Sequence, residues 1–191
     1  MSVYYTSDTH GLHLKVAQTR GFEDETEYTE WIIDQYAQQT KKGDQLWILG
    51  DLTIGATTKE DTVLRMLREF LPGRSLHFIG GNHDSVHPGN NRNSHNRLKA
   101  FYETFDSVQL FARRKIAGES VMLSHFPYEG DRDEERFEEY RLKDSGKWLL
   151  HGHLHSEHTF NNNQDKSIHI GFDTWKRIVD LEEIAELIKG A

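Results

Sequence analysis

Val3-Tyr4-Tyr5-Thr6-Ser7-Asp8-Thr9-His10 begins as a β-prone, apolar run and ends in side chains that can bind a metal ion. The same order, a short apolar run followed by polar residues, recurs four times further along the chain. Those polar blocks are Gly50-Asp51 after residues 45–49, Gly80-Gly81-Asn82-His83-Asp84 after residues 75–79, Ser124-His125 after residues 120–123, and His151-Gly152-His153-Leu154-His155 after residues 147–150. In layered α/β folds, ligands bind at the carboxyl ends of the strands. The five blocks therefore predict one site built from five loops of an α/β domain.

The rest of the chain alternates predicted strands with predicted helices. Further strands are expected over residues 107–111, 114–117 and 167–170, and Gly118 predicts a hairpin turn between residues 114–117 and 120–123. Apolar spacings of three and four predict helices around residues 28–36, 63–71 and 98–105, the second opened by Thr58 with Asp61 and the third by Ser94. A last helix is predicted from the N-cap Asp180, with Glu183 at its third position, to a stop at Gly190. Because no repeat and no Pro- or Ser-rich linker divides the chain, we expect residues 1–191 to form a single domain.

Composition excludes several classes of protein. The 191 residues carry 23 Lys and Arg against 31 Asp and Glu, and this formal net charge of −8 argues against binding to long nucleic acid. No apolar stretch approaches the roughly 20 residues that a membrane helix needs, so no membrane partner is expected. The sequence shows no signal peptide before the strand at residues 3–6, and we expect a cytoplasmic protein. Cysteine is absent, which excludes disulfides and thiolate chemistry.

The polar blocks consist of residue types that bind transition metals through nitrogen and oxygen. Asp, His and Asn side chains suit Mn, Fe, Ni or Zn, and the chain contains 12 His. In Asp8-Thr9-His10 and in His153-Leu154-His155 the outer residues are two apart, so in extended backbone both side chains would point to the same face. Glycine in three of the blocks would let the backbone turn tightly beside a metal, at Gly50, Gly81 and Gly152.

The ordered set of blocks resembles the calcineurin-like metallophosphoesterase superfamily. That family's pattern is Asp-x-His, Gly-Asp, Gly-Asn-His-Asp/Glu, His and Gly-His-x-His, and all five blocks occur here in order from Asp8 to His155. Gly171-Phe172-Asp173-Thr174-Trp175 also resembles the Gly-Val-Asp-x-Trp ending of small bacterial and phage members. The resemblance implies a four-layer αββα sandwich, in which two mixed β-sheets are flanked by helices. The predicted hairpin around Gly118 fits this arrangement better than a single parallel sheet.

The resemblance also implies a role for each matching residue. A first divalent metal would be held by Asp8, His10, Asp51 and His155. A second would be held by Asn82, His125 and His153, with the Asp51 carboxylate bridging both. We expect Mn as the metal, with Fe, Ni or Zn as alternatives. His83 would face the phosphate of the substrate rather than bind a metal.

The expected reaction follows from the charges at such a site. Two divalent ions bring +4 and the two aspartates −2, so the site would attract a phosphate ester once a bridging hydroxide leaves about +1. That hydroxide would attack phosphorus in line with the leaving oxygen, and His83 would act as general acid. A small phosphodiester or a nucleotide is the expected substrate.

Several neighbouring residues allow two interpretations. Arg92 and Arg97 could contact a phosphate or could be solvated surface residues. Asp84 and His151 could support the site from behind or be structural, and the same holds for Asp173. His13 could approach the substrate. Two polar stretches, residues 85–96 and 129–144, would form the rims of the site and set its specificity.

Three further hypotheses follow from the same residues. The segment Gly50–Gly55 lacks the second Asp and the Arg of the Ser/Thr protein phosphatases, which argues against that activity. Residues 153–158 resemble the His-x-His-x-Asp-His signature of the metallo-β-lactamase fold, but the four earlier blocks would then be unexplained. A catalytically silent metal-binding scaffold of the same fold is the alternative from a different class.

Overall fold

The strands pair into two sheets in the computed structural model, which describes residues 1–131, 136–160 and 166–190. In this described part of the chain, the first sheet has the order β4-β3-β2-β1-β9 and the second the order β5-β6-β7-β8. The strand bounds are β1 Val3–Thr6, β2 Gln45–Ile48, β3 Ser75–Ile79, β4 Ser107–Gln109, β5 Phe111–Ile116, β6 Glu119–Ser124, β7 Trp148–His151, β8 Ser167–His169 and β9 Val179–Asp180.

Both sheets are mixed. In the first, β1 to β4 run parallel and β9 pairs antiparallel with β1. In the second, β6 to β8 run parallel, and β5 pairs antiparallel with β6 through a two-residue turn. The turn residues Ala117 and Gly118 have φ values of 52° and 88°, the left-handed geometry that matches the twist of a tight hairpin. The predicted hairpin around Gly118 is confirmed.

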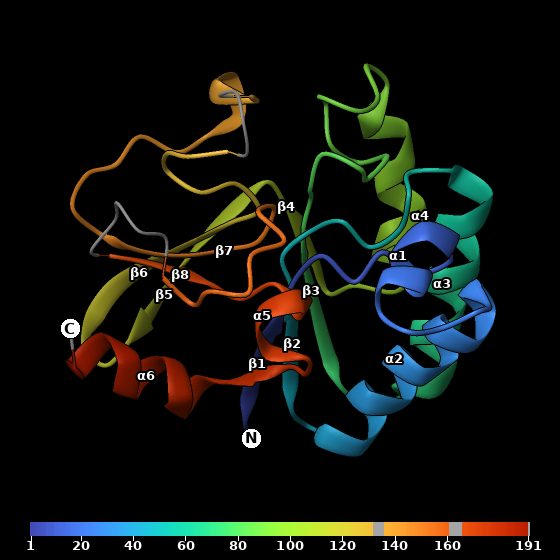
Figure 1. Ribbon diagram of the computed structural model, residues 1–191, viewed down its shortest axis with the longest axis horizontal. Coiled ribbons are helices and arrows are strands. Elements are labelled where there is room, and N and C mark those ends of the chain that lie inside the picture. Colours follow the sequence, from blue (N-terminus) through green and yellow to red (C-terminus); the bar gives the residue numbers. More distant parts are fainter. Residues whose placement is uncertain (132–135, 161–165, 191) are drawn as a thin grey trace.

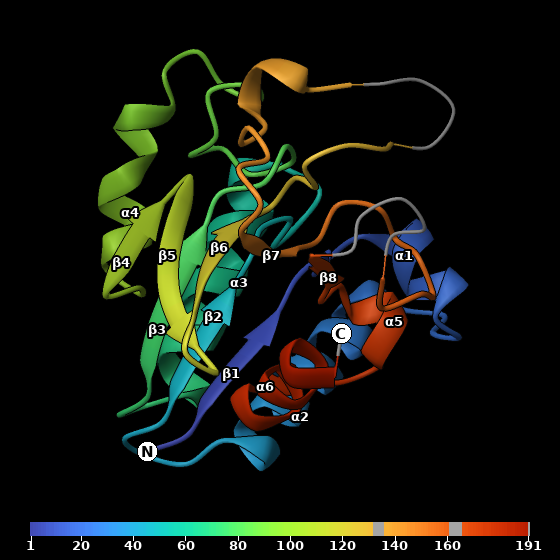
Figure 2. The same cartoon turned by 90° about the vertical axis from the view of Figure 1, so that its left-hand side faces the viewer.

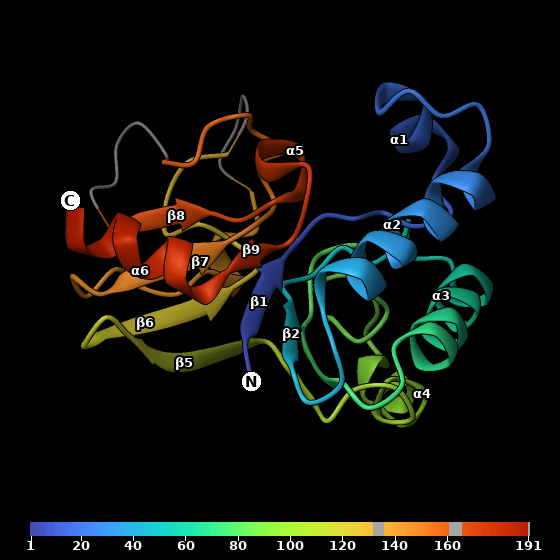
Figure 3. The same cartoon turned by 90° about the horizontal axis from the view of Figure 1, so that it is seen from below.

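Helices α2 Glu25–Gln39, α3 Thr57–Phe70 and α4 Leu98–Tyr102 cover one face of the first sheet, and α1 Leu14–Thr19 packs against α2 on the same side (Figure 3). Alternation along β2 explains why both faces of this sheet are buried. Leu46 and Ile48 pack against the helices, while Trp47 and Leu49 face the second sheet. The helix side of this core is closed by Tyr28, Ile32, Tyr36, Val63, Leu67 and Phe101.

A second core fills the space between the sheets. Tyr5 and Ile79 of the first sheet share it with Val121, Leu150 and Ile168 of the second. The C-terminal helix α6 (Leu181–Gly190) lies against β1 and β9 of the first sheet and β5 of the second, and it contributes Ile184 and Ile188 to the same core (Figures 1 and 2). The short helix α5 (Phe172–Trp175) precedes it. The predicted α/β class, with two mixed sheets and helices beside them, is confirmed.

Several predicted boundaries were wrong. Residues 107–111 do not form one strand, because the chain leaves the first sheet after Gln109 and enters the second at Phe111. Helix α3 begins at Thr57 without a side-chain cap, so Thr58 does not open it. Ser94 does not cap a helix either, since it starts the 3-10 turn Ser94–Arg97. The sequence patterns also missed α1, α5 and the two-residue strand β9.

The predicted start of the last helix is confirmed in detail. Asp180 Oδ1 accepts a hydrogen bond from Glu182 N at 2.7 Å, and Glu183 Oε2 accepts one from Asp180 N at 3.2 Å. This reciprocal pair satisfies two backbone groups that a helix terminus leaves open. In the described part of the chain, no helix combines the length and the apolar composition needed to cross a membrane.

Candidate metal centre

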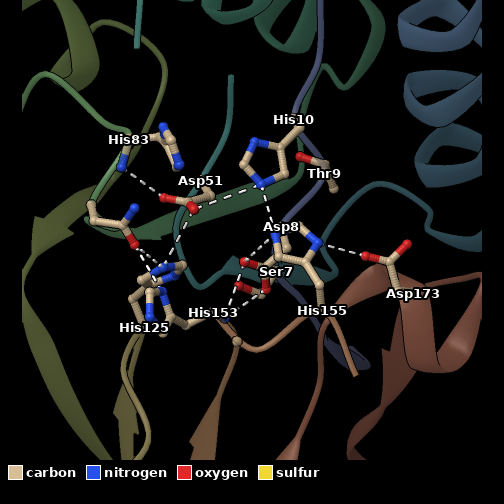
Figure 4. A network of polar contacts seen from close by, with 12 residues as sticks. Ser7, Asp8, Thr9, His10, Asp51, His83, His125, His153, His155 and Asp173 are labelled. Atoms are coloured by element: carbon tan, nitrogen blue, oxygen red, sulfur yellow. Dashed lines mark hydrogen bonds and ion pairs between the residues drawn. The ribbon is translucent and has the colours of Figure 1, made fainter. Parts of the chain in front are cut away.

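The loops after β1, β2, β3, β6 and β7 converge at one place, at the carboxyl ends of strands from both sheets (Figure 4). The first group of side chains there consists of Asp8, His10, Asp51 and His155. One ligand-type atom of each lies within 4.8 Å of the others. His10 Nε2 is 3.1 Å from His155 Nε2 and 3.6 Å from Asp51 Oδ2. Three of the four residues are fully buried, so the group is shielded from bulk water.

A second group adjoins the first through Asp51. Asn82 Oδ1 lies 3.0 Å from His125 Nε2 and 2.8 Å from His153 Nδ1, so three ligand-type atoms meet at one point. His125 Nε2 is also 3.5 Å from Asp51 Oδ2. The same carboxylate oxygen therefore faces both groups. The structure thus brings together all seven residues that the sequence predicts as ligands.

Each of the four histidines directs one ring nitrogen into these groups and the other toward an acceptor outside them. His10 Nδ1 faces the Thr53 carbonyl at 3.3 Å, and His125 Nδ1 faces the Leu49 carbonyl at 2.8 Å. The outer nitrogens of the other two face carboxylates, His153 Nε2 that of Asp131 at 3.1 Å and His155 Nδ1 that of Asp173 at 2.7 Å. An acceptor at the outer nitrogen fixes the tautomer and leaves the inner lone pair free for a metal.

The paired residues Asp8 and His10, and likewise His153 and His155, have left-handed rather than extended backbone conformations. Asp8 and His10 have φ values of 58° and 48°, and His153 and His155 have values of 72° and 51°. The two residues of each pair converge as predicted, but the extended geometry expected for them was wrong. Conformations of this kind cost roughly 1–3 kcal/mol each, and they persist where the surrounding structure enforces a functional geometry. Asp51, at 53°, adopts the same conformation.

The glycines in these blocks allow close approach of the loops. A Cβ atom on Gly81 would lie 2.5 Å from Asp51 Oδ1 and 2.9 Å from His125 Cε1. A Cβ atom on Gly152 would collide with Ser7 Oγ and Asp8 Oδ2. Any larger residue at either position would displace a residue of the centre.

Asp84 ties the second and third loops together from behind. Its Oδ2 accepts hydrogen bonds from Asp51 N at 2.8 Å and Gly81 N at 2.7 Å, and its Oδ1 accepts one from Leu52 N at 2.9 Å. Of the two interpretations of this residue, the supporting one fits these contacts. His151, the other residue left open, is fully buried behind the centre, with Nδ1 facing the Gly152 carbonyl at 2.9 Å.

Electrostatics favour a cation between the two aspartates. Burial raises the pKa of Asp51 well above its usual value, and the charge of Asp8 adds to this effect. Burial acts in the same direction on Asp8, but the imidazoles of His125 and His155 outweigh it and keep the pKa of Asp8 low. Two buried carboxylates this close to each other resist joint ionisation, and a bound metal removes that conflict. The donor set therefore fits divalent metals held by nitrogen and oxygen.

The two candidate phosphate-contacting arginines are not drawn into the centre. The guanidinium of Arg97 pairs with Glu60 and Asp61, and its Nε donates to Ser85 Oγ. Arg92 is exposed on the same loop. The contact of either residue with a substrate stays a prediction.

Two residues beside the centre were missed by the sequence patterns. Arg20 holds Asp173 through two hydrogen bonds of 2.8 Å and also donates to the Asp8 and Thr9 carbonyls. Asp131 lies within the charged stretch at residues 129–144, of which residues 132–135 fall outside the described part of the chain. No spacing rule connects Arg20 or Asp131 to the five polar blocks, so the sequence patterns could not place them beside the centre, whereas Asp173 is one of the possible supports that the sequence predicts.

Comparison with known proteins agrees with this geometry. Residues 1–177 match the model of the calcineurin-like phosphoesterase superfamily domain. The Gene 66 protein of Mycobacterium phage L5 is 36% identical over 197 residues, which cover 98% of this chain and 94% of that protein. The Gene 66 protein of Mycobacterium phage D29 is 35% identical over 196 residues, which cover 98% and 96%. A protein of unknown function from Aquifex aeolicus shares the fold, with a TM-score of 0.68 and 22% identity over 97% of this chain and 98% of that one. The chain belongs to the calcineurin-like phosphoesterase superfamily.

Proposed function

We propose that this protein is a dinuclear, metal-dependent phosphohydrolase that acts on a small phosphodiester or a nucleotide. The observation that carries the proposal is the position of Asp51. Its Oδ2 lies 3.6 Å from His10 Nε2 in the first group and 3.5 Å from His125 Nε2 in the second. A carboxylate shared by two clusters of nitrogen and oxygen atoms suits two divalent cations held side by side.

The two groups divide the ligands between the metals. Asp8, His10, Asp51 and His155 would hold the first, and Asp51, Asn82, His125 and His153 the second. When bound, the metals would supply Lewis-acid chemistry, acidifying a water and offsetting phosphoryl charge. We propose Mn first, with Fe, Ni and Zn as alternatives that the same donor atoms accept. Because Asp8 and Asp51 are the two carboxylates in this set, a positive charge would remain to attract an anionic ester.

His83 is the residue that we propose to act on the substrate directly. Its backbone is held from two sides, because His83 N donates to Asp51 Oδ1 at 2.9 Å and His83 O accepts from Asn90 Nδ2 at 2.7 Å. Its imidazole lies 5.3 Å from that of His10, beside the first group. From there it would donate a hydrogen bond to a phosphoryl oxygen and a proton to the leaving oxygen.

The preference for a diester rests on what surrounds the centre. A dianionic terminal phosphate is usually gripped by a free guanidinium, and Arg97 is already paired with Glu60 and Asp61. The net charge of −8 favours a small substrate over long nucleic acid. Residues 85–96 and 129–144 would form the rims of the site and select the substrate. The cytoplasmic location of the protein stays a prediction.

The experiment is a comparison of bis-p-nitrophenyl phosphate with p-nitrophenyl phosphate after reconstitution of metal-free protein with Mn, Fe, Ni or Zn. We expect hydrolysis that depends on added metal and is faster for the diester. Hydrolysis by Mn-loaded protein of the monoester alone would contradict the substrate class. Two bound Mn ions without turnover of any ester would instead favour the catalytically silent scaffold.

A further inference from the structure

The histidines of the turn from Gly152 to His155 present opposite nitrogens to the centre. His153 directs Nδ1 at Asn82 Oδ1, 2.8 Å away, whereas His155 directs Nε2 at His10 Nε2, 3.1 Å away. To bind metals with these atoms, the two rings must carry their protons on different nitrogens. One short turn therefore has to hold two different tautomers.

Each of these rings has a carboxylate at its outer nitrogen. Asp131 Oδ2 lies 3.1 Å from His153 Nε2, and Asp173 Oδ2 lies 2.7 Å from His155 Nδ1. The outer nitrogens of His10 and His125 face neutral carbonyl groups instead. A carboxylate accepts a proton more strongly than a carbonyl, and it makes the inner nitrogen a better electron donor.

Arginines fix both carboxylates and offset their charge. Arg20 holds Asp173 through two hydrogen bonds of 2.8 Å, and the Arg20 side chain is itself buried. Arg136 holds Asp131 through two hydrogen bonds of 3.0 Å, and Arg141 lies 3.7 Å from the same carboxylate. The Asp131 side chain is 1% exposed, so it is held in a dry environment where its orientation matters. Because each negative charge is paired, the two residues add little repulsion against an anionic ester.

We propose that Asp131 and Asp173 are separate positioning residues, Asp131 for His153 and the second metal, Asp173 for His155 and the first. The proposal rests on the proposed dinuclear function. The two supports come from different parts of the chain, Asp131 from the loop between β6 and β7 and Asp173 from α5. Loss of either carboxylate should therefore lower the affinity for one metal and leave the affinity for the other unchanged.

The test is a titration of metal-free protein with Mn²⁺. Binding is measured by isothermal titration calorimetry and, independently, by the electron paramagnetic resonance signal of free Mn²⁺. Asp131→Asn and Asp173→Asn keep the shape of the side chain and remove its charge. Each is expected to raise the dissociation constant of one of two Mn²⁺ equivalents by about 10–100-fold. The matched control is Asp34→Asn, an exposed carboxylate on α2 outside both rims, which should titrate like the wild type.

Repeating both substitutions in a variant that lacks one ligand shows which metal each of them affects. Asn82→Ala removes a ligand from the second group alone, and the remaining Mn²⁺ equivalent should then respond to Asp173→Asn and not to Asp131→Asn. Circular dichroism before metal addition establishes that each variant is folded. If Asp173→Asn does not fold, because Arg20 loses its buried partner, the Asp131 arm decides the proposal.

The possible results distinguish failure of this inference from failure of the proposed dinuclear function. Wild-type protein that binds two Mn²⁺ ions while both variants titrate unchanged would overturn the inference and leave the proposed function standing. Equal weakening of both equivalents by either variant would also overturn it, because the supports would not be separate. Wild-type protein that binds no Mn²⁺ would refute the proposed function itself.

Discussion

Asp51→Asn is expected to remove both bound metals and to reduce hydrolysis to the level of metal-free protein. Asp51 is buried and its Oδ2 faces both groups of ligands. A unit charge at about 4 Å in a partly shielded site contributes about 4 kcal/mol, or about 10³-fold in affinity, and a divalent cation feels more. Because this oxygen faces both groups of ligand-type atoms, one substitution should weaken the binding of both metals by at least that factor.

Equilibrium dialysis against Mn²⁺ measures this effect, with the exposed Asp34→Asn as the control of equal charge change. The Asn side chain can still accept the hydrogen bond from His83 N, so the loop should keep its shape. Loss of only one Mn²⁺ equivalent would show that Asp51 serves a single metal and would refute the bridging assignment.

His83→Ala is expected to keep both metals and to lose turnover. The imidazole of His83 is not among the atoms that meet in either group, whereas proton donation to a leaving oxygen is worth about 10²–10⁴-fold in kcat. The loss should be smallest for esters with good leaving groups, because a p-nitrophenolate needs little protonation to depart. Burial and the neighbouring imidazoles lower the pKa of His83, so a phosphate oxyanion beside the ring would be needed to favour its protonated form.

The measurement is kcat and KM for a series of aryl phosphodiesters whose leaving groups differ in pKa, alongside the metal content of the same samples. A steeper dependence on leaving-group pKa in His83→Ala than in the wild type is the expected signature. An equal loss for all esters would contradict the general-acid role, and loss of metal would contradict the division between ligands and His83.

The sequence predicts those features of the structure that depend on residues close together in the chain. Apolar runs such as Val3–Thr6 and Ser75–Ile79 form strands of those bounds, and the polar block after each one reaches the centre. The pair Asp180 and Glu183 predicts a helix start because the contacts between them are only three residues apart. Local chemistry and local structure agree at these positions.

The parts that could not be predicted depend on contacts between distant residues. Arg20 and Asp173 are 153 positions apart in the sequence. Asp131 lies in the loop before β7, whereas its partner His153 follows that strand. Strand β9 has two residues and is defined by its pairing with β1 rather than by its composition. Phe70 and Tyr102 fit the apolar faces of their helices, yet each is the last residue of its helix and is 54% exposed.

The most direct test of a two-metal centre is elemental analysis of protein that has been stripped of metal, reconstituted with Mn²⁺ and freed of excess ion. Two Mn atoms per chain are expected, because the two groups that share Asp51 offer two complete sets of ligands. A reconstituted, folded chain that retains no transition metal would contradict the account.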